Sequence, residues 1–134
     1  MEIDHIGYVV ADIKNSVEYF VQTYNMELCD KIIFDKKQKV WLAMLKSSNN
    51  YQIELIEPAY KDSPSFDFLK KGGGLHHICY KVKNIKSAVT KLKTQGHMPF
   101  TKISPAPLLN NSNIIFLYSK FNKQIIELVE QERI

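Results

Sequence analysis

Ile3-Asp-His-Ile-Gly-Tyr-Val-Val-Ala-Asp-Ile-Lys-Asn-Ser-Val17 lies near the start of the chain, and a close copy of it lies in the middle. The copy is Leu75-His-His-Ile-Cys-Tyr-Lys-Val-Lys-Asn-Ile-Lys-Ser-Ala-Val89. When His5 is aligned with His77, the two stretches share isoleucine, tyrosine, valine and lysine at matching positions. Unrelated segments rarely agree this well, so the chain contains an internal repeat.

A second repeat closes each half. Ile53-Glu-Leu-Ile-Glu57 returns as Ile126-Glu-Leu-Val-Glu130. Each half therefore begins with a histidine, His5 or His77, and ends with a glutamate, Glu54 or Glu127. Two copies of one module would present these side chains as equivalent pairs related by a pseudo-twofold axis.

Each half has the pattern of a strand, a helix and three further strands. Residues 3–10 and 75–82 alternate as strands do, and Asp12 and Asn84 are suited to cap the helices that follow. Further strands are predicted near residues 26–34, 40–45 and 51–57, and again near 98–103, 113–118 and 124–129. Ser63-Pro64 predicts the start of a short connecting helix that ends at the glycines 72–74. Pro105-Ala-Pro107 indicates an irregular loop.

These elements predict an α+β fold. Two tandem βαβββ modules of this kind can pair edge to edge as a rolled, incomplete antiparallel barrel. The length of 134 residues fits one domain over residues 1–134. Its parts are module 1 at about 1–60, a linker helix at about 61–74 and module 2 at about 75–134.

The composition excludes several classes of protein. The net charge of +4 comes almost entirely from lysine, with a single arginine, and this argues against a nucleic-acid partner. No apolar run is long enough to span a membrane, and we expect a cytoplasmic protein. Cys29 and Cys79 lack the spacing of a thiolate zinc site, so we expect both to be reduced and buried.

The chain resembles the vicinal oxygen chelate superfamily, which is the glyoxalase, bleomycin resistance and dioxygenase superfamily. The resemblance rests on Ile3-Asp-His-Ile-Gly-Tyr8, Ile53-Glu-Leu-Ile-Glu-Pro58, Leu75-His-His-Ile78 and Ile126-Glu-Leu128. It implies the glyoxalase-like fold, with His5, Glu54, His77 and Glu127 as ligands of one metal ion. The segment from Asp62-Ser-Pro64 to Leu75-His-His-Ile78 resembles the methylmalonyl-CoA epimerase branch, although Asp35 stands where the epimerases usually carry a glutamate.

Two imidazoles and two carboxylates suit a divalent ion such as Ni, Co, Zn or Mn. The resemblance then implies an isomerase that moves a proton next to a metal-polarised carbonyl through an enediolate. Its catalytic residues would be Glu127 as the base and Glu54 as its counterpart. We expect an acyl-CoA thioester substrate and a homodimer.

Two other functions remain open. A lactoylglutathione lyase, or glyoxalase I, would act on a glutathione hemithioacetal through the same enediolate step. A metal-free protein would instead bind and sequester a small molecule in the cleft of this fold, as the bleomycin-resistance proteins do, without catalysing a reaction. A lone histidine on a strand is more often a structural core residue than a ligand, and we expect His76 to be structural and His97 to be exposed.

Overall fold

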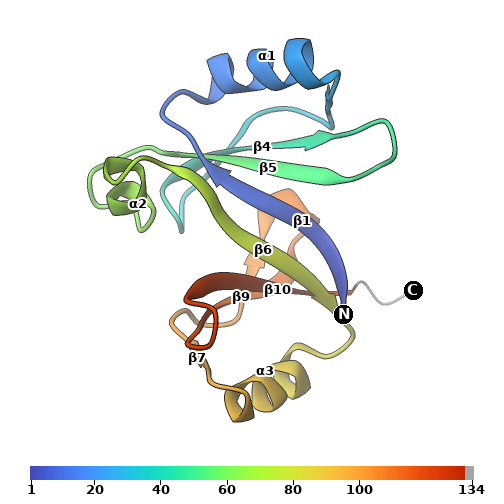
Figure 1. The fold of residues 1–134 in the computed structure, drawn as a ribbon, viewed down its shortest axis with the longest axis vertical. Helices are drawn as coiled ribbons and strands as arrows, with labels where there is room; N and C mark the ends of the chain where they lie inside the picture. The colour runs from blue at the N-terminus through green and yellow to red at the C-terminus, as the bar shows by residue number, and fades with distance from the viewer. Residues whose placement is uncertain (132–134) are drawn as a thin grey trace. The chain divides into compact units, whose positions relative to one another are not determined.

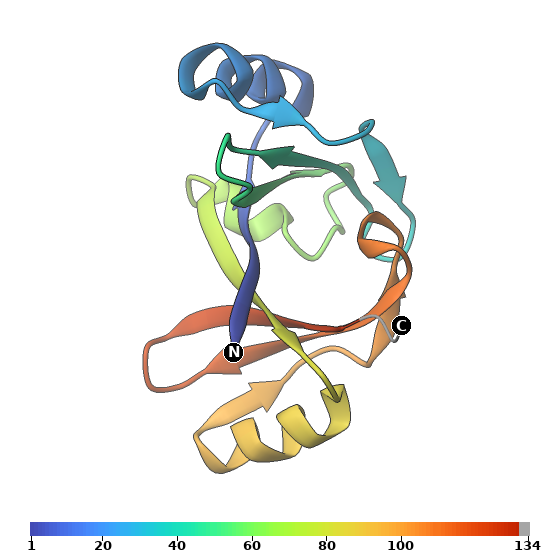
Figure 2. The same ribbon diagram turned by 90° about the vertical axis from the view of Figure 1, so that its right-hand side faces the viewer.

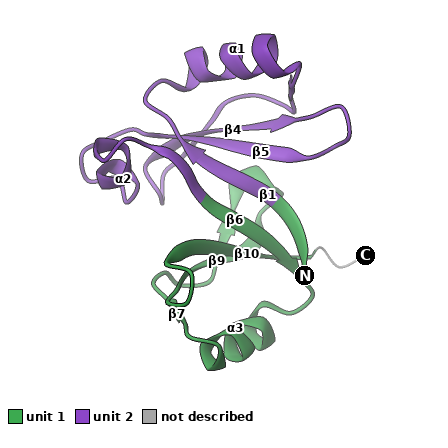
Figure 3. Cartoon of the chain, viewed as in Figure 1, with its two compact units in different colours: residues 1–4, 77–134 green, residues 5–76 purple. Residues whose placement is uncertain are grey.

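A computed structural model describes residues 1–131 of the chain. The chain divides into two compact units, which Figure 3 distinguishes by colour. Unit 2 is His5–His76, and unit 1 consists of Met1–Asp4 together with residues 77–131. Each unit thus contains one copy of the histidine and glutamate repeat. The organisation as one domain over residues 1–134 stays a prediction.

Unit 2 contains a small mixed sheet with a helix against one face. In chain order its elements are β1 (Glu2–Val9, which begins in unit 1), α1 (Ile13–Tyr24), β2 (Glu27–Leu28), β3 (Ile33–Asp35), β4 (Val40–Lys46), β5 (Gln52–Pro58) and α2 (Phe66–Lys70). The strand order is β2-β4-β5-β1, and β3 also pairs with β4. β5 runs antiparallel to β4 and parallel to β1.

Helix α1 follows β1 because Asp12 caps it. The Asp12 carboxylate accepts a hydrogen bond from the backbone N–H of Asn15 at 3.0 Å, as the sequence predicts. The helix ends where Asn25 adopts a left-handed conformation with φ 55°. Its apolar face packs on β4 and β5 (Figure 1), where the fully buried residues include Leu45 and Leu55.

Unit 1 repeats the plan. Its elements are β6 (Gly74–Val82, which begins in unit 2), α3 (Ile85–Thr94), β7 (His97–Pro99), β8 (Ser104–Ala106), the 3₁₀ turn η1 (Pro107–Leu109), β9 (Ser112–Ser119) and β10 (Gln124–Glu130). The strand order is β6-β10-β9-β7, with β8 also paired to β9. β10 is parallel to β6 and antiparallel to β9.

The core of unit 1 lies between α3 and the sheet. Figure 2 shows the ribbon of α3 lying along the strands of this unit. Asn84 caps α3 by accepting from the backbone N–H of Ser87 at 2.9 Å. Leu117 of β9 and Leu128 of β10 are fully buried beneath the helix. Because side chains alternate along a strand, the intervening residues of β9 and β10 face away from α3.

The predicted α+β fold built from two similar modules is confirmed. The sheet is mixed, however, because the last long strand of each unit runs parallel to the first. The strand predicted at 26–34 is interrupted, since residues 29–32, which include the exposed Asp30 and Lys31, leave the sheet between β2 and β3. β8 forms inside the segment predicted as a loop. Pro105 is tolerated there because, within residues 1–131, β9 is the one strand paired with β8.

Two further predictions from the sequence are wrong. Ser63 does not cap the connecting helix, because its hydroxyl donates to the carbonyl oxygen of Lys39 and accepts from the N–H of Tyr60. Helix α2 begins instead at Phe66, after Ser65. Cys29 is exposed, whereas Cys79 is buried as expected.

Candidate metal centre

His77 and Glu127 form a buried pair in unit 1. β6 carries His77 and β10 carries Glu127, and the parallel register places Glu127 opposite Cys79, two residues beyond His77. The imidazole Nε2 of His77 lies 3.1 Å from Oε1 of Glu127. Their side chains are 0% and 4% exposed, so water has almost no access to either group.

His5 and Glu54 form the corresponding pair in unit 2. Glu54 on β5 lies opposite Gly7 of β1, which again is two residues beyond the histidine. Nε2 of His5 lies 3.6 Å from Oε1 of Glu54, and the side chains are 0% and 9% exposed. The two units therefore build the same histidine–glutamate pair with the same strand register.

The donor atoms of each pair suit a divalent metal ion. Each unit offers one imidazole nitrogen and one carboxylate in a buried position, and these four residues all carry atoms able to bind a metal. Burying an ionised carboxylate is costly unless a positive charge or hydrogen bonds compensate it. A mixed set of nitrogen and oxygen donors without thiolate is typical of Zn, Ni, Co or Mn sites.

The second glutamate of each repeated motif has a role that the sequence analysis missed. Glu57 is three residues after Glu54, so it points to the opposite face of β5, where α1 packs. Its Oε1 accepts a hydrogen bond from the backbone N–H of Ile13, the first residue of α1, at 2.8 Å. Glu130 does the same for Ile85 of α3 through Oε2 at 2.9 Å. The spacing within the repeated motif could have indicated this role.

An apolar side chain that the sequence analysis did not single out lies beside His77. Phe116 on β9 is directly opposite Glu127 in the antiparallel register. Its ring lies 5.3 Å from the imidazole of His77, centroid to centroid, with the two planes nearly perpendicular. Phe100, which is 54% exposed, lies 6.2 Å from Phe116. Only the β9–β10 register reveals this neighbourhood.

Other residues considered from the sequence have structural roles. The Asp35 carboxylate accepts from the backbone N–H groups of Lys37 and Gln38, and so holds the turn before β4. His76 packs edge-on against Phe68 at 4.8 Å, as expected of a structural residue. His97 was expected to be exposed but is half-buried, with Nδ1 3.1 Å from the carbonyl oxygen of Leu92.

A surface ion pair lies outside the candidate centre. Lys39 binds Asp62 through a hydrogen bond, and this contact lowers the pKa of the Asp62 carboxyl below its usual value. Both side chains are exposed, so the pair contributes little to stability.

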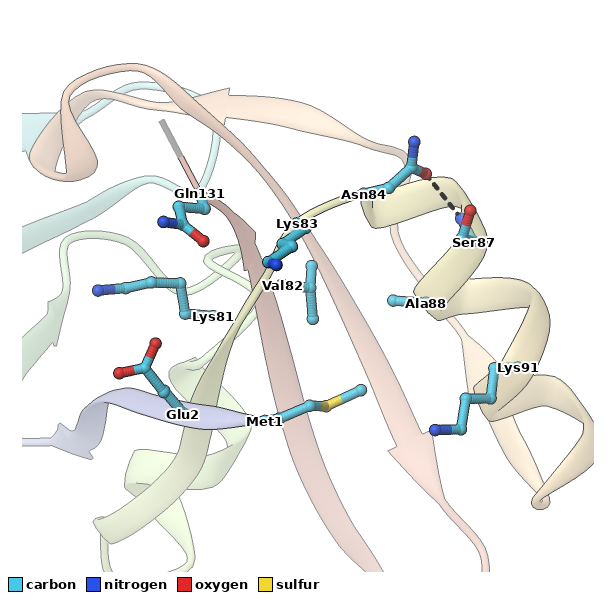
Figure 4. Close-up of a pocket in the computed structure, with 10 residues that line it drawn as sticks. All are labelled: Met1, Glu2, Lys81, Val82, Lys83, Asn84, Ser87, Ala88, Lys91 and Gln131. Atoms are coloured by element: carbon cyan, nitrogen blue, oxygen red, sulfur yellow. Dashed lines mark hydrogen bonds between the residues drawn. The ribbon is translucent and has the colours of Figure 1, made fainter. Parts of the chain in front are cut away.

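Unit 1 also contains an open groove of about 620 Å³ between the start of β1 and helix α3 (Figure 4). Lys81, Lys83 and Lys91 line it, together with apolar and uncharged polar side chains and Glu2. Lys81 also lies 3.9 Å from a carboxylate oxygen of Asp4. None of the four predicted metal ligands is among the lining residues.

Comparison with known proteins identifies the family to which the chain is similar. The model of the Glyoxalase/Bleomycin resistance protein/Dioxygenase superfamily matches residues 4–116. The ethylmalonyl-CoA/methylmalonyl-CoA epimerase of Cereibacter sphaeroides is 29% identical over 129 residues, which cover 94% of this chain and 95% of that protein.

Among the described residues, 1–131, no helix has both the length and the apolar character needed to cross a membrane.

Solved structures agree with this resemblance. The methylmalonyl-CoA epimerase of Mycobacterium tuberculosis matches with a TM-score of 0.86 and 26% identity, covering 98% of this chain and 89% of that one. A methylmalonyl-CoA epimerase in complex with methylmalonyl-CoA and NH4+ matches with a TM-score of 0.83 and 28% identity, covering 97% and 94%. The glyoxalase-like fold predicted from the sequence is confirmed.

Proposed function

Since the chain belongs to the Glyoxalase/Bleomycin resistance protein/Dioxygenase superfamily, we propose that it is a metal-dependent epimerase of a 2-methyl-branched acyl-CoA thioester. Methylmalonyl-CoA is the substrate that the names of its relatives suggest. The observation that carries the proposal is the buried histidine–glutamate pair built twice, in equal register, by the two repeats.

In this proposal His5, Glu54, His77 and Glu127 together hold one divalent ion. The burial of both carboxyl groups supports it, because a cation would compensate the negative charge of whichever group is ionised. Such an ion, once bound by these residues, would polarise the thioester carbonyl and so make the adjacent carbon more acidic. Ni, Co, Zn and Mn all fit the donor set.

The two glutamates move the proton. Glu127 accepts the proton from the carbon next to the carbonyl, and the electrons of that C–H bond pass toward the carbonyl oxygen. Glu54, protonated, then donates a proton to the other side of the same carbon, which inverts its configuration without net oxidation or reduction.

Deuterium exchange tests the proposed reaction. Metal-loaded protein in D₂O should introduce deuterium at the 2-position of methylmalonyl-CoA, as measured by mass spectrometry. Glu127→Gln should reduce the exchange rate by about 1,000-fold or more, since loss of a general base typically costs 100- to 10,000-fold. Glu18→Gln, at an exposed position on α1, is the matched control and should retain the wild-type rate.

Metal binding is measured separately, by calorimetry with Ni, Co and Zn and by elemental analysis of the purified protein. His5→Ala should weaken the metal affinity, whereas His97→Ala, which removes the half-buried histidine near α3, should leave it unchanged. Equal affinity of His5→Ala and the wild type would refute the ligand assignment. Absence of any metal binding would instead favour a metal-free sequestering protein.

The substrate is tested by comparison with a rival. Loss of the absorbance of a glutathione hemithioacetal, without exchange into methylmalonyl-CoA, would identify a lactoylglutathione lyase and refute the epimerase. The homodimer is likewise a prediction, and sedimentation equilibrium should give twice the monomer mass of 15.6 kDa.

A further inference from the structure

We propose that Phe116 determines which acyl group the candidate centre accepts, by contacting the alkyl branch on the carbon that exchanges its proton. This inference rests on the proposed epimerase function. It goes beyond that function by assigning a specificity-determining residue outside the four predicted ligands. Everything that supports it lies within unit 1.

Phe116 is the direct cross-strand neighbour of the proposed base. Residues opposite each other in an antiparallel pair have Cβ atoms about 4.5–5.5 Å apart, and Glu127 is opposite Phe116. The Phe116 ring also meets the His77 imidazole, with 5.3 Å between centroids. A carbon atom placed for proton transfer to Glu127 would therefore lie within reach of this ring.

The ring is only partly covered. Phe116 packs beside Cys79, Ile114 and Val129 on the face of the sheet that points away from α3, yet it is half-buried rather than buried. His77 and Glu127 on the same face are almost completely enclosed. The accessible part of the Phe116 ring is thus an apolar surface next to a buried carboxylate.

The chemistry of this surface favours an alkyl group. The Thr101 hydroxyl accepts a hydrogen bond from the Phe116 backbone N–H at 2.9 Å. Phe100 adds a second aromatic ring 6.2 Å away. The aromatic rings offer no hydrogen bond to a carboxylate placed against them, so it would lose hydration there, whereas a methyl or ethyl branch would bury apolar area.

The backbone that carries the ring is held at both of its polar groups. The Phe116 carbonyl oxygen accepts from the N–H of Phe100 at 3.1 Å, so both backbone polar groups of Phe116 bond to the segment that follows β7. A rigid apolar surface at this position can discriminate between branches that differ by one methylene. In an apolar pocket such a difference typically changes kcat/KM by about 10- to 200-fold.

Two substrates and two variants of opposite size test the proposal. The specificity constants kcat/KM for ethylmalonyl-CoA and methylmalonyl-CoA are measured by deuterium exchange, and their ratio is the readout. Phe116→Leu should raise the ratio by about 10-fold, because it makes room for the longer branch. Phe116→Trp should lower the ratio by a similar factor. A purely structural role would instead reduce both constants together.

Phe121→Leu is the matched control, because Phe121 is 94% exposed in the turn between β9 and β10 and should leave the ratio unchanged. Circular dichroism and metal calorimetry establish that each variant folds and binds metal like the wild type. If Phe116→Leu and Phe116→Trp both keep the wild-type ratio to within about twofold while the wild type is active, this inference alone is refuted. A wild-type protein that exchanges neither substrate refutes the proposed function, and this inference with it.

Discussion

Removal of the Glu130 carboxylate should loosen the junction between β10 and α3. In the structure Glu130 accepts a hydrogen bond from the N–H of Ile85, the first residue of the helix, at 2.9 Å. A hydrogen bond to a charged group contributes about 1.5–3 kcal/mol. A negative charge at a helix N-terminus contributes about 0.3–1 kcal/mol more. Because Glu130 is only half-buried, we expect Glu130→Ala to lower the free energy of unfolding by about 2 kcal/mol.

The companion variants separate the charge from the hydrogen bond. Glu130→Gln keeps an acceptor oxygen but removes the charge, so about half of the loss should remain, roughly 1 kcal/mol. Glu57→Ala should behave like Glu130→Ala, because Glu57 makes the equivalent bond to Ile13 at 2.8 Å. Glu18→Ala, at an exposed position in α1, is the control for loss of a surface glutamate.

Urea denaturation followed by circular dichroism measures these differences. A loss of 2 kcal/mol should shift the midpoint by about 1 M, given a slope of about 2 kcal/mol per M for a small domain. If Glu130→Ala and Glu57→Ala are both as stable as Glu18→Ala, the reasoning that these carboxylates anchor the helices is wrong.

Three other predictions follow from single residues. Gly73→Ala should destabilise the protein by about 1–3 kcal/mol in the same urea assay, because Gly73 has φ +68° and an added Cβ would lie 2.7 Å from the carbonyl oxygen of Val9. Gly72→Ala is the control. Its added Cβ would meet nothing within 4 Å, so this variant measures the cost of a positive φ alone. Leu128→Ala should lower the free energy of unfolding by about 2–5 kcal/mol, since Leu128 is 0% exposed beneath α3. An unchanged urea midpoint would contradict the packing of Leu128 against that helix. A thiol reagent should label the exposed Cys29 of the folded protein within minutes and Cys79 only after unfolding, as peptide mass spectrometry would reveal.

The candidate centre was predictable because its signal is local and repeated. A histidine at the start and a glutamate at the end of each module are visible as letters in two similar stretches of sequence. Their assignment as ligands of one ion remains a prediction, and so do the catalytic roles of Glu54 and Glu127. The caps Asp12 and Asn84 were equally predictable, because capping depends on residues only three positions apart.

Other features depended on contacts between distant segments. The sequence did not indicate that residues 29–32 leave the sheet, or that Ser63 bonds to the backbone of Lys39 rather than to a helix. Asp35 stands where the epimerases usually carry a glutamate, and its carboxylate holds a turn in the structure. The Ser63 and Asp35 side chains each had several possible partners, and the folded chain selected one.

The sequence alone determined the repeat, the two-module fold, the family resemblance and the histidine–glutamate pattern, because all of these follow from residue identity and short-range periodicity. Only the tertiary structure decided that β10 runs parallel to β6, that Phe116 lies opposite Glu127, and that Glu130 reaches the start of α3. Alternation along a strand tells which residues share a face, but it does not tell which residue of the next strand lies beside them. That register is set by the packing of whole strands and helices, and it places an apolar ring next to the proposed base.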